Sequence, residues 1–493
     1  MDYVDRVTAR QRARRRRRHP ACSRPTLPVA APPRTSAITS RVSAAVAPSV
    51  CGVRSIARPR PRTRDGNRVG GSMALSSRRA RAWACAVLLA GAAAPAAGQT
   101  LTLESAIAQT LASNPDLRVY APRLAVARER AAGAALHPPL TLEAETQDAF
   151  GTGRASGFDS AETTFALSQV IELGSKRALR AAAGVAGTAV VAAERAAAEL
   201  DVLAEVTRRF IHVAADQEHL ALTMRATALA EDNVAAASAR VAVARAPEVE
   251  LRRARVTRMR AAVEQEHAEH ELLSSRRKLA AMWGDSEPRF ERVDADLYAL
   301  PSTEGYEALL ARLGSNPELL QFASEERLRD AELRVAEAHA RTDITWRAGL
   351  RLLHETNDEA LVFGVTLPLH AARRARSEIA AARAERERTA AEREAHRVRA
   401  EAQLFELFQE LGHAVVEANA LRATVLPEME ASLEATRSAF ERGRYSYLEW
   451  MDVQRELVEV QRALIDASAN AHLYRTEIER LTGEALEAAE TRP

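Results

Sequence analysis

The chain has 493 residues, a formal net charge of +3 and three cysteines. Residues 1–98 contain 20 Arg and 3 Asp, and subtracting them from 69 basic and 66 acidic residues leaves 49 and 63, a net charge of −14 for residues 99–493. Because Cys22, Cys51 and Cys85 all lie in the basic part, disulfide bonds are excluded from the acidic part.

We interpret the basic part as sequence that is absent from the mature protein. The run "RQRARRRRRHP" at 10–20 would suit nucleic acid. Residues 73–98, however, have the arginines, the apolar stretch and the small residues of a secretory signal peptide, which belongs at a true N-terminus. We therefore expect translation to start at Met73 and the mature chain to start near Gln99. Residues 1–72 are then a non-native, disordered extension, and no nucleic acid is expected as a partner.

Most of the acidic part is predicted to be long helix. It contains no run of about 18 apolar residues, so no helix is expected to span a membrane. Residues 175–244 and 373–426 contain no proline and are rich in Ala, Glu, Arg, Leu and Val. Seventy helical residues extend roughly 105 Å, more than a globular domain needs. Ala and Leu recurring on a charged background suit coiled-coil packing.

A pair of matching motifs indicates an internal repeat. The sequence "SNPDL" at 113–117 returns as "SNPEL" at 315–319, each time after a short amphipathic segment. The residue before a proline disfavours the helical conformation, and proline suits the first turn of a new helix. Each motif therefore predicts a helix break, followed by a second helix that ends near His137 in the first copy and near Arg341 in the second.

Beyond these helices the hydrophobic period changes from 3.6 to 2, which predicts strands. Segments 140–150 and 163–171 form a first hairpin, and segments 344–353 and 360–369 form a second. Strands of about 9–11 residues cross an outer membrane when tilted. We predict a lipid-facing side with Leu142, Phe165, Trp346 and Phe363, and a polar interior side with Glu143, Arg347 and Arg351.

Two hairpins supply only four strands, which cannot close a barrel. Open strand edges are not tolerated in lipid. Several copies of the chain must therefore contribute, and three copies would supply twelve strands.

Each β-hairpin is followed by a helical hairpin with a long outgoing arm and a shorter returning arm. Its tips are "ARAPEVE" (244–250) and "ERGRYSYLE" (441–449), and Pro427 should kink the second outgoing arm. The chain thus divides into two repeats and a tail. The first repeat is 99–300, with a β-hairpin at about 139–171 and a helical hairpin at about 174–283; the second is 301–485, with hairpins at about 343–370 and 373–483; the tail is 486–493.

These features resemble the TolC family of trimeric outer-membrane efflux channels over residues 101–485. The resemblance is carried by the paired SNP motifs, "LSQVIELGSKR" (167–177), "GVTLPL" (364–369) and "LPEMEASLEATRSAFERGRYSYLEWMDVQREL" (426–457). It implies a duplicated chain, mainly α with a small β part. The long α-helical hairpins form a helical barrel, and the two β-hairpins join a trimeric 12-stranded outer-membrane β-barrel. The first tip departs from the family pattern, because it lacks a glycine.

The resemblance implies a passive channel without cofactor or catalytic residues. Such a homotrimer lies in the lipid of the cell outer membrane of a Gram-negative bacterium and works with a periplasmic adaptor (membrane fusion protein) and an inner-membrane RND pump. "SQVIELGSKR" and "GRYSYLEWMDVQREL" are more similar to the CzcC-like branch, which implies heavy-metal cations as cargo. The alternatives are a channel for drug efflux or type I secretion and, outside the family, a periplasmic helical-hairpin adaptor or structural coiled-coil protein. An enzyme is not expected, because phosphate-binding glycine loops, G-x-S-x-G and H-E-x-x-H motifs are missing from the sequence.

The second tip carries the candidate entrance residues. Glu449 and Asp452 lie three apart on one helix face beyond Gly443, and they match an acidic pair that the resemblance places around the periplasmic entrance. In a trimer they would form two rings of carboxylates that attract cations; two ordinary solvated residues are the alternative. The expected tip contacts are Phe440, Gly443, Tyr445 and Tyr447, with Glu248 and Glu250 of the first tip.

His267 and His270 lie one turn apart among glutamates and are a weak candidate pair for binding Zn or Cu. A solvated face of a charged helix is the simpler interpretation, because a channel should not hold its cargo tightly. We therefore expect no resident metal.

Overall fold

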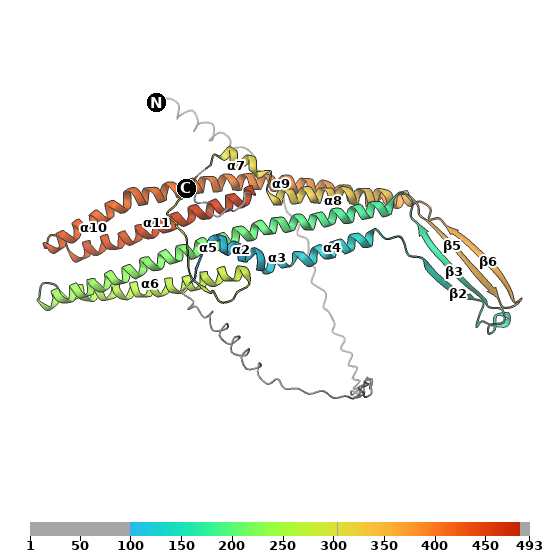
Figure 1. Ribbon diagram of the computed structural model, residues 1–493, viewed down its shortest axis with the longest axis horizontal. Coiled ribbons are helices and arrows are strands. Elements are labelled where there is room, and N and C mark those ends of the chain that lie inside the picture. Colours follow the sequence, from blue (N-terminus) through green and yellow to red (C-terminus); the bar gives the residue numbers. More distant parts are fainter. Residues whose placement is uncertain (1–98, 303, 484–493) are drawn as a thin grey trace, which may run out of the picture. The chain divides into compact units, whose positions relative to one another are not determined.

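The structure is a computed structural model that describes residues 99–302 and 304–483 (Figure 1). The expected extension, the signal peptide and the tail 486–493 lie outside the described residues. None of the helices within these ranges is both long and apolar enough to cross a membrane.

The helices and strands occur twice in a similar order, mainly α with a small β part, as expected. The first repeat consists of β1 (Gln99–Leu101), α2 (Leu103–Ser113), α3 (Pro115–Arg118), α4 (Tyr120–Ala134), β2 (Thr141–Gln147), a 3-10 turn η1 (Gly153–Ala155), β3 (Glu162–Ile171), α5 (Lys176–Ala242), α6 (Glu248–Ala280), a 3-10 turn η2 (Ala281–Trp283) and β4 (Phe290–Val293). The second consists of α7 (Tyr306–Leu313), α8 (Pro317–His339), β5 (Ile344–Leu353), β6 (Asp358–Thr366), α9 (Ala371–Ala420), a π-helical segment η3 (Leu421–Val425), α10 (Leu426–Glu441) and α11 (Tyr447–Thr482).

Both SNP motifs break helices as predicted. α2 ends at Ser113 and α7 at Leu313, and the proline of each motif opens the next helix. In the first repeat this next helix differs from the prediction, because the four-residue α3 ends before Val119 and α4 starts after it.

The asparagine of each motif also ties the start of its repeat to the end. The side-chain oxygen of Asn114 accepts hydrogen bonds from the backbone N–H groups of the two residues after the proline, at 2.9 and 3.0 Å, and so caps α3. Its Nδ2 donates to the carbonyl of Met282 at 2.9 Å. Asn316 caps α8 through a single hydrogen bond, accepted by its side-chain oxygen from the Glu318 N–H at 2.6 Å, and its Nδ2 donates to the carbonyl of Leu481 at 2.6 Å. Both side chains are buried, and we call each set of contacts an asparagine clasp.

The four long strands form one antiparallel sheet in the order β2-β3-β5-β6. Its two hairpins are joined through β3 and β5, from Glu162 opposite Leu353 to Ile171 opposite Ile344. β2 and β6 are therefore the edges, and each has a neighbouring strand on one side only.

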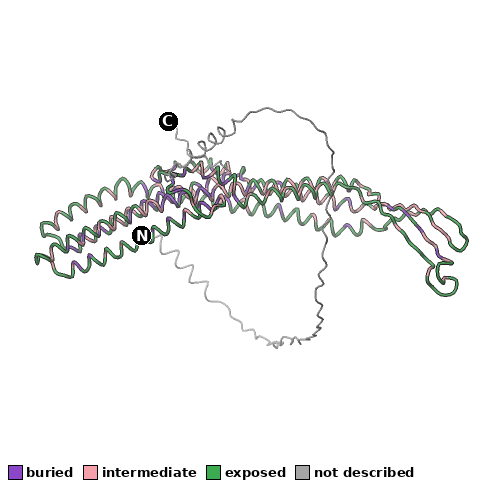
Figure 2. The backbone as a smooth tube through the Cα atoms, turned by 60° about the horizontal axis from the view of Figure 1, so that its bottom comes forward, coloured by how far each residue is buried: buried purple, intermediate pink, exposed green. Residues whose placement is uncertain are grey.

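The long helices form a layer that continues the sheet (Figure 1). Near the sheet α4 packs on α5, α5 on α8 and α8 on α9; farther away α6 packs on α5, α5 on α11, and α11 on α9 and α10. The buried residues, purple in Figure 2, gather in the middle of the helical part, where α2 covers α5 and α7 covers α9.

The second outgoing arm is interrupted near the predicted position. The π-helical segment Leu421–Val425 separates α9 from α10, and Pro427 follows in the first turn of α10. Proline has no N–H for the helical ladder, and a π turn is a common site of irregularity in such a helix. The interruption thus begins ahead of the proline rather than at it.

Candidate functional site

The turns at the ends of the two helical hairpins are built from different residues. In the second turn Gly443 has φ +73° and Ser446 caps α11. The Ser446 N–H donates to the Glu449 carboxylate at 2.7 Å, and the Glu449 N–H donates to the Ser446 hydroxyl at 3.3 Å, a reciprocal capping box that fixes the start of α11. In the first turn Ala244 takes the left-handed conformation, φ +56°, that glycine takes more easily.

The two candidate ring carboxylates are both exposed, but their partners differ. Hydrogen bonds from the backbone and hydroxyl of Ser446 hold the pKa of Glu449 below its ordinary value. A negative charge at a helix N-terminus is also favourable. Asp452 forms an ion pair with Arg455, with Oδ1 and Nη2 2.5 Å apart. Glu449 is therefore a charged helix cap, whereas Asp452 is partly neutralised by an arginine.

Aromatic side chains join the second tip to the first hairpin. Phe440 stacks on Trp450 with ring centroids 5.0 Å apart, Tyr447 packs edge-on against Trp450 at 6.1 Å, and the Arg240 guanidinium lies 4.3 Å from the centre of the Phe440 ring. Tyr445, by contrast, is exposed. This tip cluster also contains side chains of the first hairpin, among them Ala237, Leu251 and Ala254.

The acidic residues of the first tip also differ in their surroundings. Burial, with the nearby Glu250 carboxylate, raises the pKa of Tyr447. Glu248 instead forms an exposed ion pair with Arg252 at 2.7 Å. Sequence reasoning missed Trp450, although its position three residues after Tyr447 places it on the same helix face and could have indicated it.

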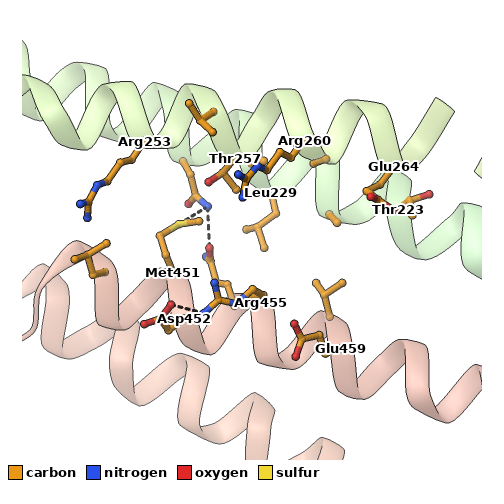
Figure 3. A pocket seen from close by; sticks show the side chains of 18 of the residues that line it. Thr223, Leu229, Arg253, Thr257, Arg260, Glu264, Met451, Asp452, Arg455 and Glu459 are labelled. Carbon is orange, nitrogen blue, oxygen red and sulfur yellow. Dashed lines mark hydrogen bonds and ion pairs between the residues drawn. The ribbon is translucent and has the colours of Figure 1, made fainter. Parts of the chain in front are cut away.

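A groove of about 790 Å³ lies next to the tip cluster, between α5, α6 and α11 (Figure 3). A buried polar pair lies in its wall, where Asn233 Nδ2 donates to Gln454 Oε1 at 2.8 Å. Arg253 and Arg260 line it from α6, and Arg455 lines it from α11. Glu264, Asp452 and Glu459 line the groove as well. The groove thus combines a polar bridge between the two hairpins with a rim of both arginines and carboxylates.

The register of the sheet sorts its side chains onto two faces. The four residues predicted to meet lipid share one face: Leu142, Phe165, Trp346 and Phe363. On the other face Arg347 pairs with Glu143 at 3.2 Å and Glu145 at 3.3 Å, and Arg351 pairs with Glu162 at 2.8 Å. One face is therefore mainly apolar and the other is a ladder of ion pairs that joins the two β-hairpins.

The histidine pair on α6 is exposed. His267 pairs with Glu271 at 3.2 Å, and no third ligand accompanies His267 and His270. Across residues 99–302 and 304–483, no group of three or more His, Cys, Asp or Glu side chains is placed to hold a metal ion.

Comparison with known proteins connects both repeats to one family. A family model described as outer membrane efflux protein matches residues 106–285 and 310–484. The chain is 29% identical over 383 residues to the cobalt-zinc-cadmium resistance protein CzcC of Cupriavidus metallidurans, which covers 78% of this chain and 90% of CzcC. The fold is similar to the solved structures of CusC (TM-score 0.66, 14% identity, 78% of this chain and 92% of that one) and of VceC from Vibrio cholerae (TM-score 0.64, 18% identity, 78% and 97%).

Proposed function

We propose, from the premise that this chain belongs to the outer membrane efflux protein family, that it is the channel of a tripartite efflux system and passively conducts its cargo from the periplasm to the exterior. The observation that carries this proposal is the family match to both repeats, each of which contains a β-hairpin and a long helical hairpin. The members of this family are channels and not enzymes.

Heavy-metal cations are the proposed cargo. The similarity to CzcC, whose name records resistance to cobalt, zinc and cadmium, supports this choice because it extends over 90% of that protein. The net charge of −14 on residues 99–493 also favours cations over anions.

The proposed working form is a homotrimer in the lipid of the outer membrane of a Gram-negative bacterium, with its helices in the periplasm. The unpaired edges β2 and β6 support this assembly, because open edges in lipid must be paired. Three four-stranded sheets would close a 12-stranded barrel with the apolar face toward lipid and the ion-pair ladder inside. A periplasmic adaptor and an inner-membrane RND pump would complete the path.

Glu449 and Asp452 are the proposed lining of the periplasmic entrance. Three copies would arrange them in two rings, and rings of acidic side chains select for cations. The lowered pKa of Glu449 keeps the carboxylates of its ring negatively charged, whereas the ion pair with Arg455 reduces the negative charge of the Asp452 ring. Glu449 is therefore the proposed dominant charge at the entrance.

Metal tolerance of a strain that lacks this chain tests the proposal. Growth is measured with graded Co²⁺, Zn²⁺ and Cd²⁺ and with a panel of drugs, before and after the gene is restored. Restored tolerance to metal ions alone is the expected result. Restored tolerance to drugs alone would assign the chain to drug efflux. A product that fractionates with the inner membrane or the soluble periplasm would instead favour an adaptor or a structural coiled coil.

A further inference from the structure

The passages between the sheet and the long helices are basic. The chain makes four such passages, at residues 135–140, 171–180, 341–343 and 370–378 (Figure 1), and we call these residues the junction. They include seven Lys or Arg and three Asp or Glu, a net charge of +4, whereas residues 99–493 together carry −14. The junction thus has the opposite charge to the rest of this part of the chain.

The three carboxylates of the junction already have basic partners. The ion pairs are Lys176–Asp343, Arg180–Glu172 and His339–Glu378. Lys176 is buried and lies 2.8 Å from its partner, so this pair is a fixed part of the fold. The three pairs leave no carboxylate of the junction to neutralise its other arginines.

Four of these other arginines are exposed and unpaired. Arg373, Arg374 and Arg376 lie at the start of α9, and Arg341 follows the end of α8. Within residues 99–302 and 304–483 none of the four forms an ion pair, and the first turn of α9 has no acidic residue. A guanidinium presents paired N–H donors that match a phosphate. The four arginines are therefore suited to phosphate groups from outside the chain.

Exposed apolar side chains accompany the arginines. The side of the sheet that carries Phe165 and Phe363 is apolar, and every second residue toward the helices continues that side. These positions hold leucine or isoleucine with 40–68% of the side chain exposed: Leu140, Ile171, Leu173, Leu367 and Leu369. The apolar side of the sheet therefore extends into the junction, where it meets the arginines.

Trp346 marks the level of this boundary. It is the third residue of β5, on the apolar side, and lies opposite Val365 of β6. Tryptophan is enriched where a membrane meets water, and outer-membrane barrels have aromatic girdles there. Arg341 precedes Trp346 by five residues, which span roughly 18 Å at most. A membrane surface at the level of Trp346 therefore brings the arginines beside the lipid headgroups.

We propose that the four unpaired arginines of the junction bind the phosphate groups of anionic phospholipids in the membrane leaflet that faces the periplasm. The exposed leucines beside them lie among the acyl chains of the same lipids. Arginines at the level of the phosphates and leucines nearer the bilayer centre together hold the sheet at a fixed depth. The proposal rests on the proposed outer-membrane location, and it identifies the class of lipid that this end of the sheet selects.

Quenching of Trp346 fluorescence by brominated lipids tests this selection on the full chain. Trp83, Trp283 and Trp450 are replaced by phenylalanine, which leaves Trp346 as the one tryptophan of the sequence. The protein is reconstituted into mixtures of phosphatidylcholine and phosphatidylglycerol in which one lipid at a time carries bromine on its acyl chains. The quenching curves give the affinity for phosphatidylglycerol relative to phosphatidylcholine at the lipid positions beside Trp346.

The expected affinity ratio is roughly fivefold or more in favour of phosphatidylglycerol, because one basic side chain near an anionic surface contributes about fivefold. In about 1 M salt the ratio should fall toward one, since the screening length is then about 3 Å. The combination Arg373→Gln, Arg374→Gln and Arg376→Gln should also bring the ratio close to one. Lysine at the same three positions keeps the charge and should keep most of the preference.

Three exposed arginines of α6 supply a matched control. Arg255→Gln, Arg258→Gln and Arg260→Gln change the net charge by the same amount in a helix that packs on α5 away from the sheet. This variant should keep the affinity ratio of the parent protein. A ratio that falls as far in the control as in the α9 variant would overturn the proposal, because net charge alone would then explain the preference.

Bilayers of brominated phosphatidylcholine alone separate this proposal from the proposed location. Strong quenching of Trp346 there, with an affinity ratio of about one in the mixtures, would overturn the headgroup recognition and leave the membrane location intact. Absence of quenching in either lipid would overturn both. The same bilayers report whether each variant is inserted, so a preference that survives the three glutamine substitutions in an inserted protein would also overturn the role of the arginines.

Discussion

Removing one asparagine clasp should loosen the repeat that contains it and leave the other unchanged. Asn316→Ala removes both the oxygen that caps α8 and the donor to the buried carbonyl of Leu481. Loss of an N-cap costs about 1 kcal/mol, and a buried carbonyl without its donor costs about 1–3 kcal/mol. The free energy of local opening should therefore fall by about 2–4 kcal/mol.

Amide hydrogen exchange measures this loss where it occurs. A fall of 2–4 kcal/mol corresponds to exchange that is roughly 30- to 1,000-fold faster. The acceleration should affect the first turn of α8 and the last turn of α11. Asn114→Ala should have the equivalent effect on α3 and on the residues around Met282.

A conservative variant separates the two functions of the side chain. Asn316→Asp keeps an acceptor for the α8 cap but has no donor for Leu481. It should accelerate exchange at the end of α11 and spare the start of α8. Unchanged exchange at the end of α11 in Asn316→Ala, or equal acceleration in both repeats, would refute the local closure of each repeat.

Three further predictions concern the tips and the sheet. Ala244→Gly should stabilise the first tip by about 1 kcal/mol, because the left-handed conformation costs an L-residue about 1–2 kcal/mol; slower amide exchange in that turn is the check, and faster exchange would contradict it. Glu449→Gln keeps the capping box but removes the charge, so together with Asp452→Asn it should weaken cation selectivity and block by multivalent cations in planar bilayers while trimers remain intact. The folded-state pKa of Glu449 is depressed, so the stability that its ionised form adds is present above the ordinary glutamate pKa of about 4.3 and is lost as the pH falls through the lower folded value. Because Glu449 stays ionised down to that lower value, the block by multivalent cations should persist just below about pH 4.3. Phe363→Arg should cost about 2–4 kcal/mol on a lipid-facing side, whereas Arg347→Gln breaks partly exposed ion pairs worth about 1 kcal/mol or less; equal yields of detergent-resistant trimers would contradict the face assignment.

The features that sequence predicted are those controlled by neighbouring residues. Pro115 and Pro317 fix their own φ and lack an N–H, so the helix breaks could be read from five-residue motifs. The alternation of side chains in the strands likewise assigned Phe363 and Arg347 to opposite faces of the sheet before its register was known.

The features that sequence did not predict depend on distant partners. The hydrogen bond from Asn316 to Leu481 joins residues 165 positions apart, and no local pattern marks it. Trp450 acquires its role from Phe440 and from the first hairpin, which only the folded chain brings together. Ala244 shows the converse case, because the turn imposes a conformation that the residue itself disfavours.

The π-helical segment changes the spacing of the apolar residues along the second outgoing arm. Apolar residues packed toward α11 recur every seven positions on either side, but the interval across the segment is eight. They are Leu404, Leu411 and Ala418 before it, and Leu426, Leu433 and Phe440 after it. In an uninterrupted helix the extra residue would turn the later set by about 100° away from its partner. The π turn accommodates this one extra residue, so both sets still face α11. Deletion of one residue from 421–425 should therefore restore a regular α-helix in which the seven-residue spacing continues without interruption.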